Sequence, residues 1–266
     1  MSLPSGSAEG YRPPRDAPFQ TGLLARLNAV LAWRVRIRHV TSRLERPLAS
    51  FTFDDFPRSA WTVGGLILRR YNAAATYYVA GRFCGVTEGG VIYYDAEDLK
   101  AVHEEGHEVG CHTYTHRHSS LLTPSELRAD WDRNCAFVRQ VLGDVKVSSF
   151  AYPFGAVSPL SKVLASRRFR CSRGIRPGVN AGAVDIDQLR VVRLESSLWS
   201  AQSVEQSVEE AKKSNGWIVF VSHDLSETPT SYGIHPGGLD HALATVRGAG
   251  IDILPVRDAL ARLLAS

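Results

Sequence analysis

The sequence predicts an α/β fold in which one domain forms a (β/α) barrel of seven to eight strands. From Ala49 onward, short segments rich in aromatic and β-branched residues alternate with segments of helical periodicity. This alternation is typical of a parallel sheet with helices between its strands. The 266 residues, 44% of them hydrophobic, are enough for the core of one such barrel.

The strands and helices follow one another in a regular order. Asp95 and Thr123 stand where helices need capping residues, and Gly106 and Gly143 stand where those helices end. A segment rich in Gly and Pro, 174–182, predicts a loop. We expect strands at 50–53, 75–79, 108–111, 148–152, 169–172, 189–194, 217–221 and 251–254. We expect helices at 60–71, 96–105, 124–142, 158–167, 201–214, 239–249 and 256–264.

An N-terminal extension, residues 1–48, precedes the barrel domain, which we place at residues 49–266. Residues 1–20 are polar, contain four prolines and lack the apolar segment of a secretory signal, so we expect a cytoplasmic protein. Residues 21–40 carry leucines and valines at helical spacing with arginines among them, which predicts a basic amphipathic helix. Packing on the domain is its expected role, and peripheral contact with an anionic membrane is the alternative.

The overall charge and the cysteines exclude some classes of function. The formal net charge is +4. The sequence has no dense run of basic residues interleaved with aromatic ones, so it does not indicate a nucleic-acid partner. The four cysteines form no Cys-x-x-Cys pair, so we expect buried reduced thiols.

Polar residues gather where three of the expected strands end. Asp54 and Asp55 follow the first strand, His112 and His116 follow the third, and His223 follows the strand at 217–221. Each group alone has an ordinary explanation, such as a helix cap, a solvated turn or a hydrogen-bonded histidine. Because active sites of barrels form at the carboxyl ends of the strands, their joint placement predicts a metal site there.

These residues lie in segments that resemble the ordered motifs of the polysaccharide deacetylase family, also called the NodB-homology or carbohydrate esterase family 4 group. The segments are Thr52-Phe53-Asp54-Asp55, His112-Thr-Tyr-Thr-His116, Phe150-Ala-Tyr-Pro153-Phe154-Gly155 and Val219-Phe220-Val221-Ser222-His223. The resemblance spans roughly residues 49–260 and implies a distorted (β/α) barrel.

The resemblance also implies a function, the hydrolytic removal of N-acetyl groups from amino sugars of an oligosaccharide or polysaccharide. It implies one divalent metal ion, usually zinc, held by Asp55, His112 and His116. Asp54 would be the general base and His223 the general acid. Only the family order separates the roles of the two aspartates. Backbone N–H groups around Pro153 and Phe154 are expected to contact the substrate oxyanion.

The chain departs from the family pattern in two of these motifs. Phe56 stands where the family usually has glycine, and Ala151 stands where it has an arginine that orients the base. We expect Arg193 to replace that arginine, and Trp199 to form an apolar wall for the acetyl group. Two other functions stay open, namely hydrolysis of a small non-sugar amide and sugar binding without catalysis.

Overall fold

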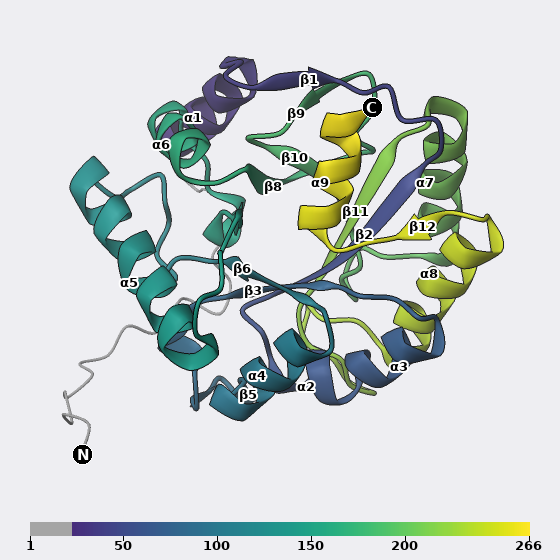
Figure 1. Cartoon of the computed structure of the whole chain (residues 1–266), viewed down its shortest axis with the longest axis horizontal. Coiled ribbons are helices and arrows are strands. Elements are labelled where there is room, and N and C mark those ends of the chain that lie inside the picture. Colours follow the sequence, from purple (N-terminus) through teal and green to yellow (C-terminus); the bar gives the residue numbers. More distant parts are fainter. Residues whose placement is uncertain (1–22) are drawn as a thin grey trace.

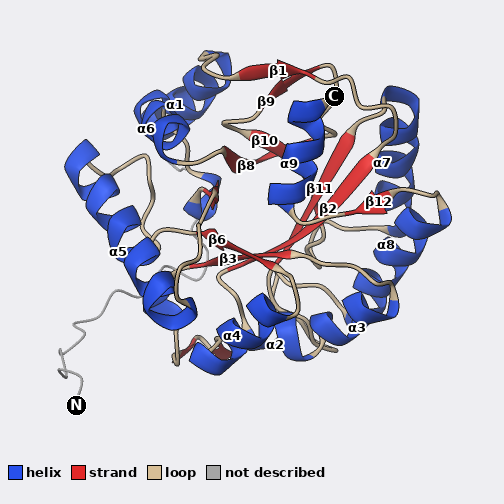
Figure 2. Ribbon diagram, in the orientation of Figure 1, coloured by secondary structure: helices blue, strands red, loops and turns tan. Residues whose placement is uncertain are grey.

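Seven parallel strands close into a barrel in the computed structural model, which describes residues 23–266 (Figures 1 and 2). Around the barrel they follow chain order, and β11 pairs with β2 to close it. The predicted fold class is therefore confirmed. The strands are β2 (Leu48–Asp54), β3 (Thr76–Val79), β6 (Glu108–Cys111), β7 (Ser149–Ala151), β8 (Cys171–Pro177), β10 (Leu189–Arg193) and β11 (Trp217–Ser222). The short β12 (Asp252–Ile253) pairs with the first two residues of β2.

Helices surround the barrel (Figure 2), and α4 (Ala96–Glu104) and α5 (Pro124–Leu142) begin at the capping residues that the sequence indicated. The side chain of Asp95 accepts hydrogen bonds from the Glu97 and Asp98 N–H groups, and Thr123 and Glu126 cap α5 reciprocally. The expected helix at 60–71 is divided at Val63 into two helices. The helices are α2 (Arg58–Thr62), α3 (Gly64–Arg70), α4 (Ala96–Glu104), α5 (Pro124–Leu142), α6 (Pro159–Arg168), α7 (Ala201–Ser214), α8 (Pro236–Gly248) and α9 (Val256–Ala265).

The segment between β8 and β10 differs from the sequence prediction. A loop was expected from Gly174, but β8 continues to Pro177 because it pairs with β10 across a bulge. The following β9 (Ala183–Asp185) pairs with β1 (His39–Thr41). Because β1 includes residues 39 and 40, the helix expected at 21–40 is shorter than predicted. Helix α1 spans Leu23–Arg34, and residues 21 and 22 lie outside the described part of the chain.

Part of the N-terminal extension is bound to the barrel by buried polar contacts. The Lys162 side chain on α6, fully buried, donates to the carbonyl oxygens of Ala32 and Val35 and pairs with Asp185 on β9. Arg38 pairs with the buried Asp187. In residues 23–266, no helix has the length and apolar character needed to cross a membrane.

The two ends of the barrel differ in character. Residues Leu260 and Leu263 of α9 pack with Trp217 and Val219 of β11 in one apolar cluster. Helix α9 lies across the barrel opening that faces the viewer in Figure 1. The strands begin at this end, so their carboxyl ends, which carry the polar residues, are left for a functional site.

Candidate metal centre

The first strand ends in a strained turn that presents two carboxylates. Asp54 is the last residue of β2 and is 5% exposed. Asp55 and Phe56 follow with φ of 62° and 55°, in the left-handed region that disfavours residues other than glycine. The Phe56 ring is fully buried and stacks on Tyr94 with ring centres 4.8 Å apart. Aromatic packing therefore holds the conformation that the family's glycine adopts freely.

The two histidines lie in the loop after β6. The ring nitrogen Nδ1 of His112 is 2.8 Å from the Ala151 carbonyl oxygen. A nitrogen facing a carbonyl must donate, so the lone pair of His112 is on Nε2. His116 has φ of 53°, and its N–H donates to the Thr113 side chain at 3.1 Å. The two histidines therefore lie in a loop and not on a helix.

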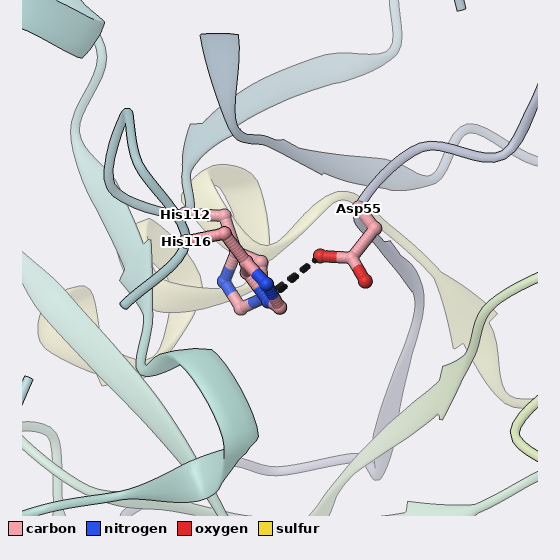
Figure 3. A group of neighbouring side chains, drawn as sticks. All are labelled: Asp55, His112 and His116. Carbon is pink, nitrogen blue, oxygen red and sulfur yellow. Dashed lines mark ion pairs between the residues drawn. The ribbon is translucent and has the colours of Figure 1, made fainter. Parts of the chain in front are cut away.

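Asp55, His112 and His116 converge on one point, as Figure 3 shows. Oxygen Oδ1 of Asp55 lies 3.0 Å from His116 Nε2 and 3.4 Å from His112 Nε2. Two ligands at zinc-bond lengths on a tetrahedron are about 3.3 Å apart. The same Oδ1 is buried and accepts no hydrogen bond from the residues described. An orphaned buried carboxylate oxygen between two imidazole nitrogens fits a divalent cation.

The protonation states of His112 and Asp55 suit metal binding. Burial lowers the pKa of His112 to about 4, so its ring is neutral near pH 7. Burial would raise the pKa of Asp55, but the neighbouring His116 and His112 outweigh it and keep that pKa below its usual range. A neutral imidazole and an ionised carboxylate are the forms that bind metal.

A buried arginine holds the other carboxylate, Asp54. The Arg173 guanidinium is fully buried, pairs with Asp54 Oδ1 and donates to the Gly174 carbonyl oxygen at 3.1 Å. Burial would raise the pKa of Asp54, but the Arg173 charge, followed by those of His112 and His223, lowers it below the usual value. Asp54 is therefore an oriented, ionised carboxylate next to the three converging ligands.

The arginine that the structure shows paired with Asp54 is Arg173, and the expected role of Arg193 beside the base stays a prediction. Arg193 forms an ion pair with Glu195, two residues further along the chain. Arg173 is the register partner of Ala151 across the β7–β8 pairing. The chain therefore carries the guanidinium one strand away from its family position. No local sequence signal marks Arg173, because β8 also contains Ser172 and a second arginine, Arg176.

His223 follows β11, the strand that pairs with β2 and so lies next to the strand that carries Asp54. Its Nδ1 is 3.3 Å from the Tyr232 carbonyl oxygen, which leaves Nε2 for other contacts. The loop behind it is fixed by Asp224, whose carboxylate accepts the Thr230 N–H at 2.9 Å. The charge of His223 lowers the pKa of both Asp54 and Asp55, so it acts on the same site.

The expected substrate-contacting residues lie at different places. Pro153 and Phe154 form the 3₁₀ turn η2 (Pro153–Gly155), and the Phe154 ring centre is 4.5 Å from that of His116. Trp199 is half-buried on the main core, and its ring centre is 6.3 Å from that of His241 on α8. The contact of Trp199 with an acetyl group stays a prediction.

A barrel whose mouth joins two histidines and an aspartate to a second, arginine-bound aspartate is typical of metal-dependent hydrolases. The polysaccharide deacetylase family model matches residues 41–169. The predicted resemblance to this family is therefore confirmed for residues 41–169.

Known proteins share parts of the sequence and the fold. A bifunctional xylanase/deacetylase of Pseudobutyrivibrio xylanivorans is 25% identical over 118 residues, 44% of this chain and 18% of that protein. The chain thus matches about a fifth of this curated relative.

Solved structures share the fold. The family 4 acetyl xylan esterase of Clostridium thermocellum, in complex with cobalt, has a TM-score of 0.57 at 19% identity, with 80% of this chain and 90% of that chain covered. A peptidoglycan N-acetylglucosamine deacetylase also has a TM-score of 0.57, at 16% identity, with 82% and 90% covered. A pseudoenzyme of the same family from Bacillus anthracis gives 0.57 at 17% identity, with 83% and 68% covered.

Proposed function

We propose that the protein is a metal-dependent deacetylase that removes N-acetyl groups from amino sugars of an oligosaccharide or polysaccharide. The observation that carries this proposal is the ion pair of Arg173 with Asp54, directly beside the cluster of Asp55, His112 and His116. A protein that only held a metal would have no use for a second buried carboxylate ionised by a dedicated arginine.

Two side chains carry out the proton transfers of the proposed reaction, one as the base and the other as the acid. Asp54, ionised and oriented by Arg173, accepts a proton from the attacking water. His223, with Nδ1 directed to the Tyr232 carbonyl oxygen, donates from Nε2 to the departing amine nitrogen. An amide needs such an acid because an unprotonated amine is a poor leaving group. Phe154 and Pro153 border the ligands and shield the substrate carbonyl from bulk water.

Asp55, His112 and His116 would hold the divalent ion, and we propose zinc because one carboxylate and two imidazoles suit it. When bound, the ion supplies Lewis-acid polarisation of the acetyl carbonyl and lowers the pKa of the water.

The test is acetate release from N-acetylglucosamine oligomers by the metal-loaded protein, by the chelated protein and after zinc is returned. We expect chelation to abolish release and zinc to restore it. Asp55→Ala and His112→Ala should lose the metal, whereas Asp54→Asn should keep the metal and lose turnover. Stoichiometric metal in either ligand variant would refute the site. Full turnover by Asp54→Asn would refute the base.

Two other functions are separated by the same assay. A non-catalytic member of the family would bind sugar and release no acetate, but the five residues assigned to metal and proton transfer are all present here. An amide hydrolase for small molecules would release product from linear or cyclic amides and leave the sugar oligomers intact. Acetylated xylan belongs in the screen because a similar structure is that of an acetyl xylan esterase.

A further inference from the structure

An arginine-lined cavity of about 660 Å³ lies on the outside of the barrel, between α1, the segment around β9 and the end of α7. None of the residues of the metal centre lines it. Helix α1, β1 and β9 lie together on one side of the barrel in Figure 1. The residues on which the argument depends are Trp33, Arg34, Arg36, Arg176, Gln188 and Arg190.

The cavity carries an excess of positive charge. Among residues 23–266, no carboxylate forms an ion pair with any of its four arginines. Of the two acidic residues in the wall, Asp185 is already paired with Lys162, and Glu210 is exposed. Burial, followed by the nearby charge of Arg190, lowers the pKa of Arg176. Arg34 and Arg36 are exposed and Arg176 and Arg190 are half-buried, and together these four guanidiniums favour an anion in the cavity.

Two further side chains point to what the anion is attached to. Gln188 is 6% exposed, and its buried Oε1 has no hydrogen-bond donor among the described residues. An orphaned buried acceptor favours a ligand that brings a hydroxyl group. The Trp33 indole is 42% exposed, and the Arg176 guanidinium lies 5.0 Å from its ring centre. An exposed indole provides a flat apolar surface of the kind on which a sugar or glycerol carbon chain packs.

We propose that this cavity binds a phosphate ester of a sugar or polyol. The guanidiniums of Arg34, Arg36, Arg176 and Arg190 contact the phosphate, and Gln188 Oε1 accepts from a hydroxyl of the carrier. A phosphate dianion matches this charge better than one carboxylate, and arginine binds phosphate oxygens through two parallel N–H donors. A cavity of about 660 Å³ has room for the carrier as well as the phosphate. This chemistry is shared by a free sugar phosphate and by the headgroup of a glycerol-based anionic lipid.

The test measures binding to the full, metal-loaded chain by calorimetry at low ionic strength. The soluble probes are glucose 1-phosphate, inorganic phosphate and uncharged glucose. Sedimentation with phosphatidylcholine vesicles, with and without phosphatidylglycerol, tests the lipid source. The pocket variant is Arg176→Gln with Arg190→Gln. The control is Arg43→Gln with Arg46→Gln, which removes the same charge from two exposed residues outside the cavity.

We expect the pocket variant to weaken binding of glucose 1-phosphate, or of phosphatidylglycerol vesicles, by about tenfold per lost guanidinium contact. The control variant should bind as the parent does, and both should keep the parent's circular dichroism and acetate release. Gln188→Leu should weaken glucose 1-phosphate and leave inorganic phosphate unchanged. Binding of the soluble ester alone assigns a soluble ligand, and binding of the vesicles alone assigns a lipid headgroup.

Three results would overturn the proposal. The first is that neither the ester nor the vesicles bind. The second is an equal loss in the pocket and control variants, which would mean diffuse attraction to a basic surface. The third is binding that the pocket variant retains in full, since the anion would then occupy another site such as the metal centre.

Discussion

Replacing Arg173 by methionine should separate the role of the Asp54 carboxylate from that of the metal ligands. Methionine keeps much of the length and apolar stem of the side chain but removes the charge. Arg173 and Asp54 have side chains that are 0% and 7% exposed, so the carboxylate loses its partner in a place that water barely reaches. Breaking a buried pair costs about 3–5 kcal/mol of folding free energy. We expect the lower end of that range, because Asp54 can take up a proton once the charge is gone.

The same protonation should damage catalysis. With Arg173 in place, the pKa of Asp54 lies below its usual value, so the carboxylate is free to accept a proton from water. Without Arg173 that pKa rises, and the carboxylate also loses its orientation. Since a general base contributes about 10²–10⁴-fold, we expect kcat to fall by about 10²-fold or more. The acid limb of the kcat/KM profile should move to higher pH, which a defect in packing alone would not cause.

The measurements are acetate release under saturating substrate, metal content of the purified protein and urea unfolding. Arg173→Lys should recover part of the turnover and shift the acid limb back. The matched control is Arg38→Met, which breaks an ion pair with the buried Asp187 away from the metal centre, where the two side chains are 34% and 0% exposed. It should lose stability and keep most of its turnover. The reasoning fails if Arg173→Met turns over normally, or if the control loses as much turnover as Arg173→Met.

Two further predictions concern stability. At Phe56, removal of the buried ring should cost about 3–5 kcal/mol in both Phe56→Ala and Phe56→Gly. The left-handed backbone should nevertheless leave the glycine variant about 0.5–1 kcal/mol more stable than the alanine variant, the reverse of the usual order, as urea unfolding would reveal. At His107, burial lowers the pKa to about 4 while Nδ1 accepts the Ala75 N–H. The unfolded chain therefore binds the extra proton between about pH 6.5 and 4, and stability should fall as the pH drops through this window. His107→Gln should flatten that slope, and an unchanged slope would contradict the assignment.

The order of strands and helices could be predicted because its signals are local. Caps such as Asp95 and Thr123 act within one helical turn, and an apolar segment such as 217–221 is recognisable alone. The clustering of Asp55, His112 and His116 could be predicted because their motifs follow strand ends, which a parallel barrel brings to one mouth. Arg173 could not be placed in this way. Its position depends on which residue of β8 lies beside Ala151 of β7, and register is a property of two strands rather than of one. The bulge between β8 and β10 escaped the sequence for the same reason.

Backbone strain is concentrated at the metal centre, and aromatic packing maintains it. In the described chain, seven residues other than glycine have positive φ. Two of them, Asn72 and Asn215, stand at helix ends, and asparagine tolerates the left-handed conformation there. The other five, Asp55, Phe56, Thr113, His116 and Phe154, border the site. Such conformations persist only where the surroundings fix them. Here the Phe56 ring stacks on Tyr94, and the Phe154 ring stacks on His118 with centres 4.2 Å apart. The ligand geometry is therefore set by rings that touch no metal, so substitutions of those rings should loosen metal binding while every ligand remains.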